Sequence, residues 1–311
     1  MIKSAASISL VLLLVPFKGA GQDAQSEQAA ASAGRAAESR TAAAQEVRKF
    51  AFTFAGRPDV KLKLHEVPVL RYTNPLRGDV YSDLFVWTHE GRPEVVASVN
   101  SWYSPRRYLG VAVTSLSLEK LIGTREEQEI WRPRSAGIEL RPVRGAAAPA
   151  GTPSQRLMQM GVLARQFTAE YQRKARYNEG GPLRLLSRPL YRYERTSDEV
   201  QDGALFALAD GTSPQLNLVI ESRRTTTGYG WLYALAPNNS VKYRVLHNDR
   251  EVWSLPQLAP PWPNSKNPIN TYTVFPDLQN EGRTRELAEQ LRIAAMAQRE
   301  SSASEPEPRE D

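Results

Sequence analysis

The chain has 311 residues, of which 41% are hydrophobic and 24% charged, with a formal net charge of +6. This composition is typical of a globular protein and too hydrophobic for a fully disordered one. Basic residues alternate with acidic ones, as in Arg125-Glu126-Glu127, which indicates a solvated surface and makes nucleic acid an unexpected partner. The absence of cysteine excludes disulfides, thiol catalysis and a lipid-modified N-terminal cysteine.

The first residues have the pattern of an export signal. Lys3 supplies a positive charge, residues 5–17 are apolar, and Gly19-Ala20-Gly21 precedes a plausible cleavage position. The apolar run is shorter than the roughly 20 residues that cross a bilayer as a helix. We therefore expect residues 1–21 to be a signal peptide. The mature protein is then periplasmic or extracellular, with no membrane span.

Polar segments flank the body of the chain. Residues 22–46 consist mainly of Ala, Gln, Ser, Glu and Arg, so they bury too little apolar surface to offset the entropy of ordering. This composition predicts a disordered or loosely helical tether. Residues 301–311 are similar and predict a disordered tail.

An internal repeat organises the body. Residues 68–131 are echoed by residues 189–253 at an offset of 121 to 122 positions. Both stretches open on P-x-x-R-Y, contain apolar runs separated by Gly- and Pro-containing turns, and end on E-x-W. Alternating and β-branched runs bounded by such turns predict an antiparallel meander in each copy.

Residues that recur in both copies are expected to serve the fold of each copy. We expect the repeated arginine to bind a carboxylate of its own copy, such as Glu129 or Glu251, because a guanidinium and a carboxylate form strong paired hydrogen bonds. The recurring residues are Arg71, Tyr72 and Trp131 in the first copy and Arg192, Tyr193 and Trp253 in the second.

Other segments complete the prediction of secondary structure. Phe50, Phe52 and Phe54 alternate along a strand that begins a hairpin. A helix follows Thr152-Pro153, with an apolar stripe that continues to Tyr171. A second helix is expected from Thr284 to Gln298. The fold class is therefore mainly β (α+β), with two internally duplicated antiparallel β units, a connecting amphipathic helix and a C-terminal helix.

This pattern divides the chain into seven parts. After the signal peptide (1–21) and the tether (22–46), the expected parts are a first β unit (47–145), a linker and connecting helix (146–182), a second β unit (183–262), a Pro-rich segment and C-terminal helix (263–300) and the tail (301–311).

Sequence motifs of catalysis and cofactor binding are absent. The chain contains no G-x-S-x-G and no glycine-rich phosphate loop. His65, His89 and His247 are the only histidines, and none has a second histidine at the spacing of a helical zinc site. We expect no metal and no cofactor, and the balance is against an enzyme. A hydrolase with paired carboxylates stays open, since two acids need no motif; its candidates are Asp83, Glu90, Asp202, Asp210 and Glu221.

Aromatic residues in or near strands are the candidates for ligand binding, because flat rings stack on sugars and peptides; packing in the core is the alternative. The candidates are Trp87, Trp102, Tyr103, Tyr108, Trp231 and Tyr233. A second reading is a polyanion patch formed by the basic pairs Arg106-Arg107, Arg173-Lys174 and Arg223-Arg224.

The ordered set of segments PVLRYTNPLRG, DLFVWT, GRPEVVAS, DGALFAL and REVWSLP resembles a family of exported bacterial proteins of unknown activity. The resemblance spans residues from about 45 to 276 and implies an exported body without assigning a reaction, ligand or catalytic residue. The sequence thus predicts a non-catalytic exported module that recognises a cell-surface polymer, a peptide or a partner protein. A carbohydrate-active hydrolase with paired carboxylates is the alternative.

Overall fold

A computed structural model describes residues 20–74, 78–104, 106–173, 179–194, 197–226, 228–257 and 266–303. The expected signal peptide, apart from its last two residues, lies outside the described residues, as do Pro-rich residues 258–265 and the tail beyond residue 303. The chain forms two compact units that divide at Glu38 and Ser39. The second unit contains all the described strands.

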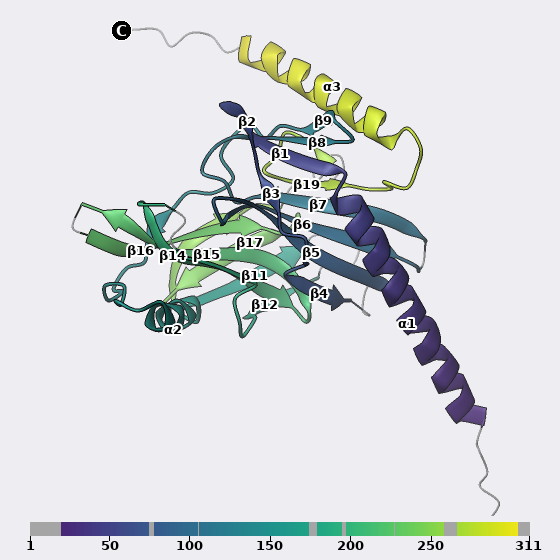
Figure 1. Ribbon diagram of the computed structural model, residues 1–311, viewed down its shortest axis with the longest axis horizontal. Coiled ribbons are helices and arrows are strands. Elements are labelled where there is room, and N and C mark those ends of the chain that lie inside the picture. The colour runs from purple at the N-terminus through teal and green to yellow at the C-terminus, as the bar shows by residue number, and fades with distance from the viewer. Residues whose placement is uncertain are drawn as a thin grey trace, which may run out of the picture. The chain divides into compact units, whose positions relative to one another are not determined.

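The fold is mainly β, with antiparallel sheets and three helices in the described residues. The first copy comprises two sheets, which Figure 1 shows in purple to teal. Its strands are β1 (Phe50–Phe54), β2 (Arg57–Lys61), β3 (Lys63–Leu64), β4 (Leu70–Thr73), β5 (Val80–His89), β6 (Arg92–Trp102), β7 (Tyr108–Ser115), β8 (Leu121–Arg125) and β9 (Gln128–Trp131).

The second copy repeats this order of strands. Its elements are β11 (Phe167–Arg173), β12 (Glu179–Leu185), β13 (Tyr191–Glu194), β14 (Val200–Asp210), β15 (Ser213–Thr225), β16 (Gly228–Pro237), β17 (Lys242–His247) and β18 (Arg250–Leu255).

The strand registers confirm the duplication. Lys63 of β3 pairs with Thr88 of β5, and Arg184 of β12 pairs with Ala209 of β14 at the same offset. The order β2-β1-β8-β9 in one copy matches β12-β11-β17-β18 in the other. The single long strand β12 replaces β2 and β3, which explains why the second copy is one continuous sheet and the first is two. The repeat also begins earlier than its sequence identities, at the strands β1 and β11.

The two copies exchange their last strands. Strand β10 (Arg141–Pro142), which follows the first copy, pairs with β16 of the second. Strand β19 (Tyr272–Phe275), which follows the second copy, pairs with β7 of the first. Each copy therefore supplies an edge strand to the sheet of the other, and the two form one body.

Three apolar clusters hold the body together. In the first copy, the ring of Phe52 makes edge contacts with Trp87 and Trp131 at centroid distances of 4.8 and 5.7 Å. The corresponding core of the second copy contains Phe167 against Tyr233. The third cluster includes Leu84 of β5 and residues of both copies. Its apolar side chains join the sheets of the two copies; they include Val86 and Val96 of the first copy and Leu205, Val219 and Ala234 of the second.

The helix α1 (Ala20–Val47) covers the segment expected to be a tether. Its residues Ala43 and Val47 are buried with the first core. In the second copy, α2 (Pro153–Ala164) precedes β11 at the same distance as α1 precedes β1, and it lies against β14 and β15 (Figure 1). The end of α1 is therefore part of the first copy.

The connecting helix is shorter than its apolar stripe predicts. It ends at Ala164, and the residues from Phe167 form strand β11, in which Phe167, Ala169 and Tyr171 are buried alternately. The same apolar residues fit both a helical and a strand period, and pairing with β17 decides in favour of the strand. The start agrees with the sequence, because Thr152 caps the helix and Pro153 is its first residue.

The C-terminal helix α3 (Arg283–Ala303) includes the predicted range. Its apolar side chains Leu287 and Leu291 are buried, and the helix runs along β9 of the first copy (Figure 1). Within the described residues, no helix has the length and apolar character needed to span a membrane.

Candidate functional site

The hairpin between β6 and β7 carries a cluster of aromatic rings and arginines. The rings of Trp102 and Tyr108, which are paired residues across the hairpin, stack with centroids 5.4 Å apart and planes 9° from parallel. Beside them Tyr81 of β5 makes an edge contact with Tyr103 at 5.8 Å. All four rings are partly exposed. The structure thus gathers three of the six aromatic candidates at one end of the first copy.

Two arginines from the hairpin loop lie over these rings. The guanidinium carbon of Arg106 is 5.9 Å from the centroid of Tyr108, and that of Arg107 is 5.4 Å from the centroid of Tyr103. Arg106 is 76% exposed and is 3.6 Å from Asp277. A guanidinium over a ring retains N–H groups at its edge that can bind a carboxylate or phosphate. We call Tyr81, Trp102, Tyr103, Arg106, Arg107 and Tyr108 the aromatic-arginine tip.

The electrostatics of the tip favour an anion. Burial raises the pKa of Tyr108, while the nearby Arg106 acts in the opposite direction. The phenol is therefore neutral at physiological pH. The two arginines supply positive charge, part of which Asp277 offsets at 3.6 Å from Arg106.

The corresponding hairpin of the second copy lacks this arrangement. Arg223 of β15 pairs with Gly230 of β16, as Trp102 of β6 pairs with Tyr108 of β7. The two pairs stand at the same place in the register, so Arg223 and Gly230 replace the two stacked rings. Arg223 binds Glu221 at 3.1 Å, and Arg224 lies over Tyr229. Because the second copy folds without the aromatic pair, the fold does not require it.

The other three aromatic candidates are buried. Trp87 is 1% exposed in the core of the first copy, between Phe52 and its neighbours. Trp231 and Tyr233 are 4% and 5% exposed in the core of the second copy. Burial raises the pKa of Tyr233, and Arg141 opposes that rise. These three residues pack the cores and are not gathered with the tip.

The repeated arginines bind carboxylates of their own copies, as expected, but these belong to aspartates and not to Glu129 or Glu251. Arg71 Nε is 3.1 Å from Asp83 Oδ1, and Arg192 binds Asp202 at 2.9 Å. Glu129 instead binds Arg132, and Glu251 binds Arg244. The reason is the pairing of β4 with β5 and of β13 with β14. Arg71 is paired directly with Asp83, whereas Arg192 is paired with Ala204 and reaches Asp202 two residues away on β14. Spacing along the sequence does not show these relations.

The other repeated residues also have structural contacts. Trp131 is fully buried and donates from Nε1 to the carbonyl of Asn270 at 2.8 Å, whereas Trp253 is partly buried against Tyr243. Tyr72 lies 3.4 Å from Ser98, and burial raises its pKa. Its counterpart Tyr193 belongs to a charged cluster.

That cluster joins the two copies through fully or almost fully buried groups. Arg92 Nε donates to Glu221 Oε1 at 2.7 Å, and Arg92 Nη1 donates to Glu94 at 2.8 Å. The hydroxyl of Tyr193 donates to Glu221 at 2.6 Å. Burial raises the pKa of Glu94, opposed by Arg92; burial and the charge of Glu221 raise that of Tyr193 well above its usual value.

The carboxylates proposed for hydrolysis do not converge. Asp202 pairs across the sheet with Ser222, and Gly203 pairs with Glu221. Neighbouring residues of a strand point to opposite faces, so Asp202 and Glu221 lie on opposite sides of the sheet. Asp202 binds Arg156 of α2, while Glu221 faces the first copy. Asp83 is held by Arg71, and the remaining candidates are Asp210, which accepts from Tyr171 at 2.8 Å, and Glu90, in a turn.

The described residues of the three basic pairs make different contacts. Arg224 donates to the carbonyl of Asp198, Arg106 and Arg107 belong to the tip, and Lys174 lies outside the described residues. In the part of the chain that the structure describes, no group of three or more histidines, aspartates and glutamates is close enough to hold a metal ion.

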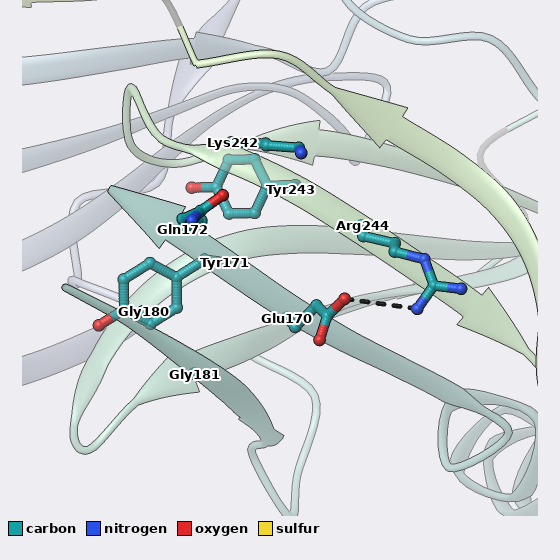
Figure 2. Close-up of a pocket in the computed structure, with 8 residues that line it drawn as sticks. All are labelled: Glu170, Tyr171, Gln172, Gly180, Gly181, Lys242, Tyr243 and Arg244. Carbon is teal, nitrogen blue, oxygen red and sulfur yellow. Dashed lines mark hydrogen bonds and ion pairs between the residues drawn. The ribbon is translucent and has the colours of Figure 1, made fainter. Parts of the chain in front are cut away.

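A shallow cleft of about 360 Å³ lies on the sheet of the second copy. Figure 2 shows Glu170 and Arg244 pointing toward each other at its edge, where they are 3.4 Å apart and about half exposed. Its residues come from β11, β12 and β17. Exposed ion pairs of this kind are common on protein surfaces, and the two tyrosines of the lining, Tyr171 and Tyr243, donate their hydroxyls to Asp210 and to the carbonyl of Gln215.

Sequence reasoning missed Tyr81, which completes the tip. A signal for it was present in the repeat, because Tyr81, Trp102 and Tyr103 are replaced by Asp202, Arg223 and Arg224 at the offset of 121. A partly exposed aromatic residue that only one copy carries is not required by the fold that both copies share. Comparing the copies for differences, as well as identities, identifies the tip.

Comparison with known proteins gave no match: no family model, no curated protein and no solved structure is similar to this chain.

Proposed function

We propose that the protein is a non-catalytic exported binding module, and that its aromatic-arginine tip binds a carboxylate-bearing polymer of the cell surface. The observation that carries this proposal is the pair of ring contacts, Trp102 with Tyr108 and Tyr81 with Tyr103, each covered by an arginine. Tryptophan, tyrosine and arginine are the residues that contribute most energy at binding surfaces.

The chemistry of the tip favours an extended, negatively charged ligand. Ring faces and edges accept the apolar faces of sugars or side chains, and guanidinium edges bind carboxylates through two parallel hydrogen bonds. The second copy supports the proposal because it keeps the hairpin and loses the aromatic pair. The separation of Asp202 and Glu221 onto opposite faces favours binding over hydrolysis. Export rests on Lys3 and the apolar residues 5–17.

Affinity electrophoresis tests the proposal. The protein is run in native gels containing polygalacturonate, polyglutamate or neutral dextran. We expect polygalacturonate to retard the protein, with retardation that weakens as salt rises, since exposed charges are screened. Polyglutamate distinguishes a polypeptide ligand from a polysaccharide. Trp102→Ala and Arg106→Gln are each expected to lower the affinity at least tenfold.

Tyr229→Ala is the matched control, because Tyr229 is a partly exposed tyrosine under an arginine on the equivalent hairpin. It should bind like the unmodified protein. Urea unfolding of each variant separates lost binding from lost folding. Equal mobility in the charged polymers and in dextran, or retention that Trp102→Ala and Arg106→Gln leave intact, would refute the proposal.

A further inference from the structure

The segment that follows β19 passes beside the tip. In the first copy, Phe275 of β19 pairs with β7. Farther along the chain, the N–H of Leu278 donates to the carbonyl of Leu109 at 2.9 Å. Pro276 and Asp277 separate Phe275 from Leu278. These contacts hold the segment against the start of β7, where the tip lies.

The strand registers give the counterparts of these residues in the second copy. Leu109 and Trp231 stand at the same place, since each pairs with a serine that recurs at the offset of 121. Phe275 pairs with the residue two positions after Leu109. Arg141 of β10 likewise pairs with the residue two positions after Trp231. Arg141 is therefore the counterpart of Phe275.

One residue is inserted in the first copy. In the second copy, the N–H of Val143 donates to the carbonyl of Trp231 at 2.9 Å, and one proline separates Val143 from Arg141. The first copy has a proline at this place and then Asp277, which is the extra residue. Its φ of 62° lies in the left-handed region, which aspartate and asparagine tolerate better than most side chains. Inserted residues of this kind often redirect a side chain beside a functional site.

The inserted residue places its carboxylate at the tip. Asp277 Oδ2 is 3.6 Å from Arg106 Nη2, and the Asp277 side chain is 44% exposed. At this distance the two charges attract each other, but the contact is longer than a hydrogen bond. A ligand carboxylate that forms two hydrogen bonds with the guanidinium can therefore displace Asp277. The stacked rings and the inserted aspartate occur in the same copy, at the same end of the sheet.

The charge of Asp277 limits what Arg106 can bind. A ligand carboxylate at Arg106 replaces an ion pair that the protein already has, and it also approaches the negative charge of Asp277. A single carboxylate therefore gains little binding energy there. A ligand with neighbouring carboxylates can pair with the adjacent Arg107 as well, which lies over the ring of Tyr103, and so gains a second ion pair. Specificity commonly arises when a site penalises the unwanted ligand in this way.

We propose that Asp277 is a specificity-determining residue of the aromatic-arginine tip: it pairs with Arg106 in the ligand-free protein and restricts the tip to ligands that carry carboxylates in series. This inference rests on the proposed function, because it concerns the same ligand. A polymer with isolated carboxylates cannot compensate for the loss of the Arg106–Asp277 pair. A polymer that is charged at every unit presents neighbouring carboxylates to Arg106 and Arg107 together.

Affinity electrophoresis with two forms of one polymer measures this specificity. Polygalacturonate presents carboxylates in series, and its highly methyl-esterified form presents isolated ones. We expect Asp277→Asn to bind polygalacturonate about two- to fivefold more tightly, since an exposed ion pair contributes little energy. The gain should be larger for the esterified form, so that the variant distinguishes the two forms less well. Asparagine tolerates the left-handed conformation, and urea unfolding checks that the variant folds.

Two further variants separate this role from a general effect of charge. Glu127→Gln removes the same charge from another exposed residue in the left-handed region, between β8 and β9, and should bind both forms like the unmodified protein. In an Arg106→Gln background, Asp277→Asn should gain little, because Asp277 acts through Arg106.

The outcomes distinguish the two proposals. No gain in Asp277→Asn beyond that of Glu127→Gln, an equal gain for both forms of the polymer, or the same gain in the Arg106→Gln background would overturn the inference and leave the proposed function standing. Failure of every variant and of the unmodified protein to bind either form would overturn the proposed function and the inference with it.

Discussion

Gly203 shows how one residue sets the position of a buried tyrosine. A Cβ at this position would lie 2.4 Å from the ring of Tyr193, so the absence of a side chain allows the ring to lie flat on strand β14. From there the Tyr193 hydroxyl reaches Glu221. In the first copy Ser82 pairs with Tyr72 at the same place, and the Tyr72 hydroxyl lies 3.4 Å from the hydroxyl of Ser98. The two copies thus share a tyrosine but use it differently.

His247 gives a prediction for pH. Burial lowers its pKa in the folded protein, where it contacts Gln166 at 3.0 Å, while the unfolded chain titrates near the ordinary value of about 6.5. As the pH falls through this value, the unfolded state takes up a proton before the folded state does. The stability that depends on neutral His247 is therefore present above about pH 6.5 and is lost as the pH falls through the folded pKa.

We accordingly expect the free energy of unfolding to fall less between pH 8 and pH 5 in His247→Gln than in the unmodified protein. Urea unfolding at a series of pH values measures this difference. His89→Gln provides the background effect of replacing a histidine. An identical pH dependence in His247→Gln and the unmodified protein would contradict the expectation.

At the scale of elements, α3 acts as a cover for one end of the first copy. Leu287 is 2% exposed, and Ile293 on the same helix is 55% exposed. Leu287→Ala removes buried methyl groups and leaves a cavity, so we expect it to lower the free energy of unfolding by about 2–5 kcal/mol. Ile293→Ala should stay within about 0.5 kcal/mol of the unmodified protein. Equal effects of the two substitutions in urea unfolding would show that α3 is not packed as described.

Sequence reasoning predicted elements best where only one period fits and the pattern repeats. The alternation of Phe50, Phe52 and Phe54 and the turns between apolar runs located the strands, and the repeat gave their order. It failed at Phe167 to Tyr171, where apolar spacing fits two periods and a long-range partner, β17, decides. Three of the four rings of the tip were among the predicted aromatic residues. The sequence did not distinguish them from the buried Trp87 and Trp231, because that distinction depends on which face of each sheet is covered.

The whole molecule depends on contacts between its two copies. The apolar cluster around Leu84 and Leu205, and the buried pair of Arg92 with Glu221, both cross from one copy to the other. Removing one copy would expose this apolar surface and break the Arg92–Glu221 pair, which would leave Arg92 with Glu94 alone and Glu221 with Arg223 and Tyr193. The exchanged strands β10 and β19 add backbone hydrogen bonds between the copies. These features together make each copy an incomplete fold.

We therefore predict that the protein can be divided between the copies only if both parts are present. Fragments of residues 22–145 and 146–311, produced together, should form a 1:1 complex, because the first carries β10 for the second and the second carries β19 for the first. Each fragment alone should unfold without a cooperative transition. Light scattering after size exclusion measures the stoichiometry, and a first fragment that ends at residue 138, without β10, should associate more weakly. Two monomers that each unfold cooperatively would contradict the prediction, since each sheet would then be stable without the edge strand and the buried charge partner that the other copy supplies.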